Sequence, residues 1–350
     1  PIGTEQIVRG TDVSFYVPRT GIEVVPDGGR YVRKAIRLEK SKGLHLRAIA
    51  DFDVEGDDVL DAGRYRAGQE IFIRDREGYF FPVSNIEVVG LLDRIPLAES
   101  EGLYVRRFDS GEISTVEGPV SYLPDPTVEE VVSRQLDGQV QDLYGIGSQE
   151  VDLAISVYVP PSTAVMITGK NKREVVIGPE TRILGYNDEL ERLTLSTGRP
   201  KCTDDLLTTC FLQIDGNKVS DLVSVKTRDH VELDVLLSYR VSFVGESGKW
   251  FNVKNYVGLL CDHLGSIIRA AARSSTIERF HENSTELLRG AVLGARSEDG
   301  KREGRHFEEN GMWVYDVEVL DVRILDEDVG DMLTEAQRTG IVTDISRQAE

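Results

Sequence analysis

The stretch at residues 230–243, HVELDVLLSYRVSF, has an apolar side chain at every second position without a miss. These positions are Val231, Leu233, Val235, Leu237, Tyr239, Val241 and Phe243. A period of two over this length predicts a long β-strand with one buried face. The preceding stretch VSDLVSVKT, residues 219–227, is the expected hairpin partner, and MWVYDVEVLDVRIL, residues 312–325, is a further expected strand.

Between these strands the apolar period changes to 3.6 residues, which is typical of helices. The first expected helix has one apolar face, made by Val253, Tyr256, Val257, Leu260, Leu264, Ile267, Ile268 and Ala271. A second helix is expected to begin at Ser275, because Ser275 and Glu278 have the spacing of a capping box. A third is expected over residues 286–295. Together these elements predict an α+β domain, with helices packed on a twisted antiparallel sheet.

The sequence ends on another apolar pattern at helical spacing. Its members are Val329, Met332, Leu333, Ala336 and Gly340. On a single chain the first four would form an uncovered apolar stripe. We therefore predict that Val329, Met332, Leu333 and Ala336 form an oligomer interface, packed against neighbouring helices in a ring. Because the chain opens without Met and stops inside this helix, we expect it to be an excerpt of a longer protein.

The N-terminal half contains segments that echo each other. They are SFYVPRTGIEVV (14–25), GYFFPVSNIEVV (78–89) and VSYLPDPTVEEVV (120–132), and related starts, GLHLRA and GLYVRR, begin at Gly43 and Gly102. A similar cadence recurs in residues 157–184, where EVVIGPE resembles the earlier STVEGPV. Short strands and Gly-Pro stops predict antiparallel hairpins. Units of this size cannot bury their own apolar faces, so neighbouring units must cover them.

The predicted fold class is α+β: tandem small antiparallel β-sheet repeats followed by an α+β domain. We expect a partial repeat at residues 1–40, a repeat at 41–92, a second repeat with a linker at 93–150, the α+β domain at 151–326 and the start of the last helix at 327–350. The linker is assigned to residues 133–150, which are polar, contain three glycines and lack periodicity.

Composition narrows the possible functions. The net charge of −19 argues against binding to DNA, because duplex-binding surfaces cluster Lys and Arg. Three cysteines without a CxxC pair fit a reducing compartment, and a cytoplasmic location is expected. No apolar run approaches the roughly 18 residues that a membrane span needs.

A calcium candidate lies in DFDVEGDDVLDA, residues 51–62. Its acids at alternate positions, followed by Gly56, imitate the opening of a calcium loop. The four candidate ligands are Asp51, Asp53, Glu55 and Asp57. The twelfth position, however, is Ala62 in place of Glu, and the flanks have the pattern of strands. We therefore favour a solvated hairpin loop and expect neither metal nor cofactor.

No catalytic residue is expected. The five histidines, His45, His230, His263, His281 and His306, include no HxxxH pair. Cys261 and His263 would lie on different faces of a helix. Nucleophile-elbow, P-loop and GxGxxG motifs are absent from the sequence. Arg47 and Arg106 have two interpretations, anion binding or pairing with acids of the next repeat or subunit, and we favour the second.

Longer stretches carry a resemblance to a known family. KGLHLRAIADF, AGQEIFIRDREGYFFPVSNIEVV and EGLYVRRFDSGEISTVEGPVSYL resemble the wall repeats of the major vault protein family. SVYVPPSTAVMITGKNKREVVIGPE, VSVKTRDHVELDVLLSYRVSF and IERFHENSTELLRGAVLG resemble its shoulder domain, which is of the stomatin/prohibitin/flotillin class (band-7, or SPFH). The resemblance covers nearly all of residues 14–350, in order.

The resemblance implies a structural shell protein whose many copies stand side by side as staves of a hollow ribonucleoprotein barrel. It further implies that residues 327–350 begin a cap helix and that the partners are copies of the chain, with protein or RNA as cargo by analogy. Two features depart from the family. The cap helix stops at Glu350, and only two or three wall repeats are present where the family has more. No residues here identify a site for the family's RNA or its enzyme passengers.

Two alternative functions are a membrane-associated scaffold and a hydrolase. A membrane-associated scaffold of the stomatin/flotillin type would use the same shoulder fold, but such proteins carry an N-terminal hydrophobic hairpin or acylation, and repeats occupy that position here. A hydrolase centred on Cys261 would need groups that orient the thiol, and the sequence around Cys261 supplies none.

Overall fold

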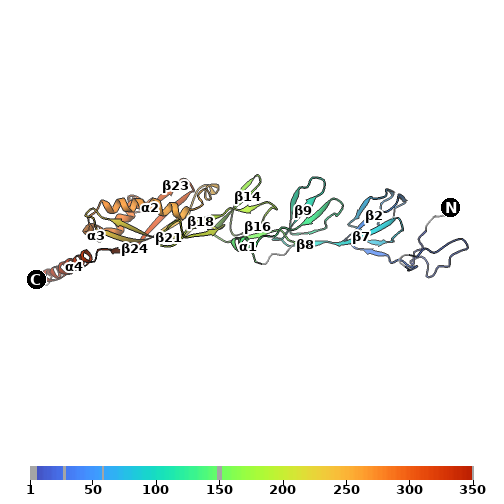
Figure 1. Cartoon of the computed structure of the whole chain (residues 1–350), viewed down its shortest axis with the longest axis horizontal. Coiled ribbons are helices and arrows are strands. Elements are labelled where there is room, and N and C mark those ends of the chain that lie inside the picture. The colour runs from blue at the N-terminus through green and yellow to red at the C-terminus, as the bar shows by residue number, and fades with distance from the viewer. Residues whose placement is uncertain (1–5, 27–28, 57–58, 148–151, 349–350) are drawn as a thin grey trace. The chain divides into compact units, whose positions relative to one another are not determined.

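In a computed structural model of the chain, residues 6–26, 29–56, 59–147 and 152–348 are described. The chain divides into two compact units. The first contains residues 1–134 and 150–154, and the second contains residues 135–149 and 155–350. Figure 1 shows small sheets in the N-terminal half and helices packed on a larger sheet in the C-terminal half. The predicted α+β fold class is confirmed.

The predicted repeats are confirmed as three modules with one topology. In each, the first and fourth strands pair, and the second strand lies between the third and fifth in an antiparallel sheet. The first module contains β1 (Ile36–Leu38), β2 (Lys42–Ala48), β5 (Glu70–Ile73), β6 (Gly78–Phe80) and β7 (Ile86–Asp93). The second contains β8 (Ile95–Leu97), β9 (Gly102–Arg107), β10 (Ile113–Glu117), β11 (Val120–Tyr122) and β12 (Glu129–Val132). The third contains β13 (Ser156–Val159), β14 (Thr163–Gly169), β15 (Lys172–Ile177), β16 (Glu180–Ile183) and β17 (Glu189–Leu190).

The modules differ in what is added to this plan. In the first, a small hairpin of β3 (Phe52–Val54) and β4 (Gly63–Tyr65) is inserted between β2 and β5. In the third, β20 (Leu212–Gln213) also pairs with β14. The earliest echo, residues 14–25, forms no strand in the part of the chain that is described.

The segment expected to be a linker contains a helix, α1 (Gly138–Tyr144). Its start is capped by Asp137, whose carboxylate accepts a hydrogen bond from the Val140 amide at 2.9 Å. Its end is Gly145 in the left-handed conformation, with φ of 66°. Tyr144 is buried in the core of the third module. Val140 and Leu143 are half-buried against the same core, but a helix of seven residues is too short to show a clear period.

The C-terminal sheet has the order β21-β22-β24-β23, and its strands are β21 (Asn217–Lys226), β22 (Glu232–Phe243), β23 (Arg305–Phe307) and β24 (Met312–Ile324). Its strands are antiparallel, which confirms the predicted hairpin and the later strand. A hairpin of β18 (Leu193–Ser196) and β19 (Leu206–Thr209) precedes this sheet, and a 3-10 turn, η1 (Ser247–Lys249), follows β22.

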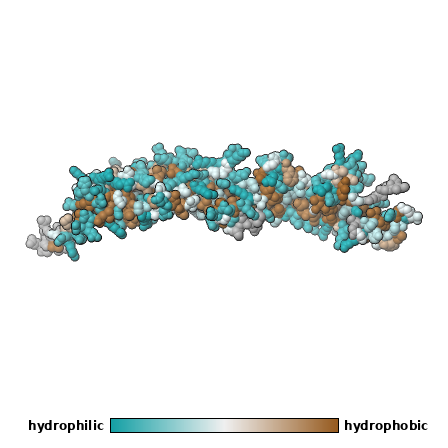
Figure 2. Space-filling view, in the orientation of Figure 1, coloured by the Kyte–Doolittle hydropathy of each residue, from teal (hydrophilic) through white to brown (hydrophobic). Residues whose placement is uncertain are grey.

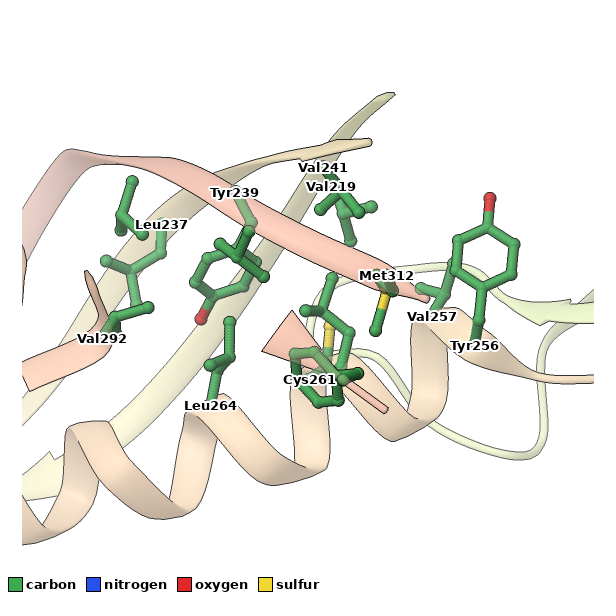
Figure 3. Packing of buried hydrophobic residues seen from close by; sticks show 14 of the residues in the cluster. Val219, Leu237, Tyr239, Val241, Tyr256, Val257, Cys261, Leu264, Val292 and Met312 are labelled. Atoms are coloured by element: carbon green, nitrogen blue, oxygen red, sulfur yellow. The ribbon is translucent and has the colours of Figure 1, made fainter. Parts of the chain in front are cut away.

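The alternating residues of β22 make the centre of the largest core. Leu233, Val235, Leu237, Tyr239, Val241 and Phe243 are all buried. They face α2 (Tyr256–Arg273) and α3 (Ile277–Leu293), which pack on one side of the sheet. Figure 3 shows Leu237 and Tyr239 pointing from the sheet toward Leu264 of α2. The predicted first helix is therefore confirmed, with all members of its apolar face except Val253, which precedes the cap residue Asn255.

The second and third predicted helices are one helix, α3, with a kink at Asn283. The expected capping box is wrong. The residue at the cap position is Thr276, and its side chain makes no capping hydrogen bond. Instead, the Asp229 carboxylate accepts from the Ile277 amide at 3.0 Å. A partner from another element satisfies the helix start, so the local Ser-x-x-Glu pattern has no role there.

The chain ends in α4 (Glu327–Gln348), which follows β24 (Figure 1). Of its residues, the side chains of 337, 340–341 and 343–348 lie outside the description. Among the described residues, no helix combines the length and the apolar character needed to cross a membrane.

Candidate self-association surface

The predicted stripe on α4 divides into two parts. Val329 and Leu333 are half-buried, and Leu333 packs against the large core of the same chain. Met332 is 63% exposed and Ala336 is exposed as well. Only Met332 and Ala336 are therefore free to contact another molecule. Sequence spacing placed all four on one side of the helix, but the turn between β24 and α4 decides which of them the chain itself covers.

The edge of β24 next to α4 is also open. β23 pairs only with Met312–Val314, so the edge of β24 beyond Val314 has no strand partner among the described residues. Two register shifts interrupt the pairing of β24 with β22, and they leave Tyr315 and Leu320 as extra residues. Leu320 and the following Leu325 are 47% and 52% exposed. The sequence period could not show that Leu320 and Leu325 are exposed, because each bulge shifts the alternation of inward and outward side chains along β24.

Exposed apolar residues also occur on the modules. Figure 2 shows hydrophobic residues reaching the surface among hydrophilic ones. In β7, which is an edge strand, Val89 and Leu91 are exposed. Scattered single residues of this kind are ordinary on protein surfaces. An apolar pair on an open strand edge is less ordinary, because it gives a neighbouring chain both backbone groups and side chains to bind.

Ion pairs within each module occupy the polar faces of the sheets. Arg47 of β2 lies 3.5 Å from Glu87 of β7, and Arg106 of β9 lies 2.9 Å from Glu130 of β12. Both glutamates stand directly opposite their arginines in the strand register. The expectation that these arginines pair with acids is confirmed, but their partners belong to the same repeat.

Glu70 joins the first of these pairs into a network. Arg47 donates to it at 2.7 Å, and the ring of His45 contacts its other oxygen. The hydrogen bond from Arg47 lowers the pKa of Glu70, partly opposed by burial. The carboxylate thus stays ionised and bridges two strands. This arrangement suits a charged structural surface more than a site with a titrating acid.

The calcium candidates do not converge in the described part of the chain. Asp51 accepts from the Ala67 amide at 2.9 Å and lies 3.5 Å from Arg64. Asp53 belongs to strand β3 and Glu55 is exposed, while Asp57 lies outside the described residues. No group of three or more potential ligands gathers among the described residues. Asp51 therefore holds its own hairpin together through the Ala67 amide and Arg64.

The histidine and cysteine candidates occupy packing positions. His263 meets Phe307 edge-on at 5.3 Å between ring centres, and His306 stacks on Trp313 at 5.6 Å. Burial raises the pKa of Cys261 above its ordinary value, and burial raises the pKa of Cys210 to about 12. A thiol that stays protonated is a poor nucleophile. The geometry thus gives a Cys261-centred hydrolase no support.

Comparison with known proteins adds independent information. Residues 215–326 match a family model described as a shoulder domain. The chain is 28% identical over 374 residues to the major vault protein of Strongylocentrotus purpuratus, a match that covers 99% of this chain and 42% of that protein. It is 28% identical over 386 residues to the major vault protein of Homo sapiens, again across 99% of this chain and 42% of the relative.

A more distant organism gives a similar match. Major vault protein beta of Dictyostelium discoideum is 30% identical over 287 residues, which are 77% of this chain and 34% of that protein. The chain thus spans less than half the length of the relatives it matches. The similarity runs through both the repeats and the shoulder domain.

Proposed function

Because this chain belongs to the major vault protein family, whose members are structural and non-enzymatic, we propose that its copies assemble side by side into a hollow, vault-like shell. The observation that carries the proposal is the similarity to major vault proteins over 99% of the chain. A ring forms when one face of each copy binds a different face of the next and the rotation closes. Such a shell would enclose a compartment for protein or RNA cargo.

The architecture supports this proposal. The modules repeat one topology along the chain, and in each the outer strands of the sheet have an edge without a strand partner among the described residues. Repetition of modest contacts along neighbouring chains adds up to a stable assembly, because each contact made holds the next pair of surfaces close together. Individually weak interfaces are therefore sufficient.

We further propose the division of the chain that this function requires. Residues 41–92 and 93–150 would be wall repeats, with a partial repeat at 1–40. Residues 151–326 would be the shoulder region, in which the third module precedes the matched residues 215–326. Residues 327–350 would begin the cap helix.

The α4 stripe gives a direct test. Negative-stain electron microscopy and size-exclusion chromatography of the purified chain should show rings or barrels. We expect Met332→Asp to reduce the assembled fraction at least tenfold, because it places a charge on an exposed apolar contact without entering the core. Thr334→Asp adds the same charge at an exposed position on another side of α4 and is the matched control.

Leu333→Asp is a poorer probe, because Leu333 packs against the core of its own chain. We expect it to lower the thermal unfolding temperature as well as assembly. A wild-type chain that remains a single-chain species at micromolar concentration would overturn the proposed function. Unchanged assemblies in Met332→Asp would instead show that the exposed side of α4 is not part of the interface.

A further inference from the structure

The two edges of the C-terminal sheet differ in charge. Along β24 and the start of α4, residues 315–331 contain seven acids and one base, Arg323. Three of these acids, Asp316, Glu318 and Asp321, are paired within the chain, with Arg289, Arg240 and Arg323. Glu327, Asp328 and Asp331 are exposed, and none forms an ion pair with another described residue. They follow β24 directly in the chain, after the exposed Leu320 and Leu325. We name this surface the acidic edge.

The opposite edge of the same sheet is β21. Residues 217–228 contain three bases, Lys218, Lys226 and Arg228, all exposed. Their one acid, Asp221, is buried on the helix side of the sheet, where it accepts from the Lys201 amide at 2.8 Å. The solvent side of β21 thus presents only bases and neutral residues. We name Lys218, Lys226 and Arg228 the basic edge.

A strap of residues 197–205, which contains Arg199 and Lys201 as well as the exposed Asp204 and Asp205, lies against the basic edge. Arg199 in this strap donates to the Ser220 hydroxyl at 2.7 and 3.0 Å. The strap is therefore held to β21 from both sides, by Arg199 outside and by the Lys201 amide inside. The strand that follows it, β19, exposes Leu206 and Leu207. These two leucines follow the strap on a separate hairpin, β18–β19.

We propose that, within the shell, the acidic edge of one copy packs against the basic edge of the next copy. This inference rests on the proposed function and names the surfaces that would carry it. Two different edges on one sheet make a head-to-tail contact, the type that closes into a ring. Charge complementarity fixes the orientation, since two acidic or two basic edges repel each other.

Existing ion pairs do not block this contact. Lys226 lies 3.2 Å from Glu232, and Lys218 lies 4.0 Å from Glu318 in β24. These side chains are largely exposed, and exposed pairs hold their partners weakly. A neighbouring chain that brings unpaired carboxylates and excludes water would strengthen the attraction to the same lysines, because the local dielectric falls.

Charge reversal in mixtures tests the proposal. One variant, Lys226→Glu with Arg228→Glu, has two acidic edges. The other, Asp321→Lys with Asp331→Lys, weakens the acidic edge and adds bases to it. The fraction of each variant alone that forms shells should be at least tenfold lower than that of the wild type. Size-exclusion chromatography and electron microscopy measure this fraction. An equimolar mixture should recover at least half of the wild-type fraction, because the two variants can alternate around the ring.

The mixture also controls for folding, since a misfolded variant is not rescued by a partner. Arg30→Glu with Lys34→Glu reverses the same number of charges at exposed positions of the first compact unit, which contains neither edge, and should assemble normally. Wild-type levels of shell in either edge variant alone, or no recovery in a mixture of variants with normal circular dichroism, would overturn the inference. An absence of shells in the wild-type chain would overturn the proposed function, and this inference with it.

Discussion

One carboxylate, that of Asp229, starts α3 from outside the helix. It lies in the turn between β21 and β22, 48 residues before the Ile277 amide that it accepts from. The first amides of a helix have no partner inside the helix, so a capping oxygen stabilises it. Here the cap also ties the helix to the sheet. A local sequence pattern cannot show a cap supplied from such a distance.

We predict that Asp229→Ala lowers the free energy of unfolding by about 1 kcal/mol, the usual loss when a capping side chain is removed. Thr276→Ala is the control, because Thr276 occupies the cap position but its side chain makes no capping hydrogen bond. Urea denaturation followed by circular dichroism measures both. An effect of Thr276→Ala equal to that of Asp229→Ala would contradict this assignment.

The Asp229 cap should also depend on pH. Burial opposes ionisation, but hydrogen bonds from Thr227 and the Ile277 amide prevail and hold the pKa of Asp229 below its ordinary value. A carboxyl with a lowered folded-state pKa stabilises the protein above its unfolded pKa of about 3.9 and loses that contribution as pH falls through the folded pKa. The difference in stability between wild type and Asp229→Ala should therefore be constant near neutral pH and shrink below about pH 4. Denaturation curves across this range measure this difference. A difference that grew as the pH fell would contradict the prediction.

At the scale of elements, the second and third modules each contain a glycine that lies very close to the backbone of another segment. Gly118 precedes β11, and Gly178 precedes β16 at the same place in the third module. A Cβ on Gly118 would overlap the backbone carbonyl of Ala98, and one on Gly178 would overlap that of Pro160. The amides of both glycines also donate to the chain near the start of the second strand, at 2.9 Å. The Gly-Pro repeats in the sequence thus mark a point where two backbones meet.

We expect Gly118→Ala and Gly178→Ala each to destabilise the chain by about 1–3 kcal/mol, the range of overpacked sites, because backbone must move to admit the methyl group. Gly90→Ala is the control, since Gly90 lies in β7 with open space around its Cβ position. Thermal unfolding of the three variants separates these outcomes. A neutral Gly178→Ala would contradict the close approach.

At the scale of the whole molecule, stability is distributed over separate cores. The first module has its own core around Leu44 and Leu46, while the sheet and helices at the C-terminal end share another that includes Leu264. These cores belong to different compact units. Units with separate cores can unfold separately, so a single two-state transition is not expected.

We predict that Leu46→Ala and Leu264→Ala, both at fully buried positions, lower the temperatures of two different unfolding transitions in a calorimetric scan. Each should cost its own unit about 2–5 kcal/mol, as other buried leucine truncations do. The scan is best run on Met332→Asp, so that assembly does not couple the units. Equal shifts of one shared transition in both variants would show that the units unfold together.

The sequence by itself determined the elements whose burial follows a regular period. Alternation from residue 231 to 243 identified the central strand, and helical spacing identified α2, because one face of each contacts a core along its full length. The recurring Gly-Pro and Val-Val segments identified the repeats, since modules of one topology place similar short segments at the same points of the fold. These features depend on residues that are close together in the sequence, so the spacing of apolar residues and the recurring segments reveal them.

Only the tertiary structure decided which groups meet across the chain. It assigned the cap of α3 to Asp229, docked α1 through Tyr144, and paired Arg47 and Arg106 inside their own modules. It also turned Leu333 toward the core and left Met332 outside. Each outcome depends on the approach of segments that are distant in sequence, and the bulges of β24 changed which side chains face outward. Periodicity carries no information about such contacts, because it records only how each residue lies relative to its own neighbours.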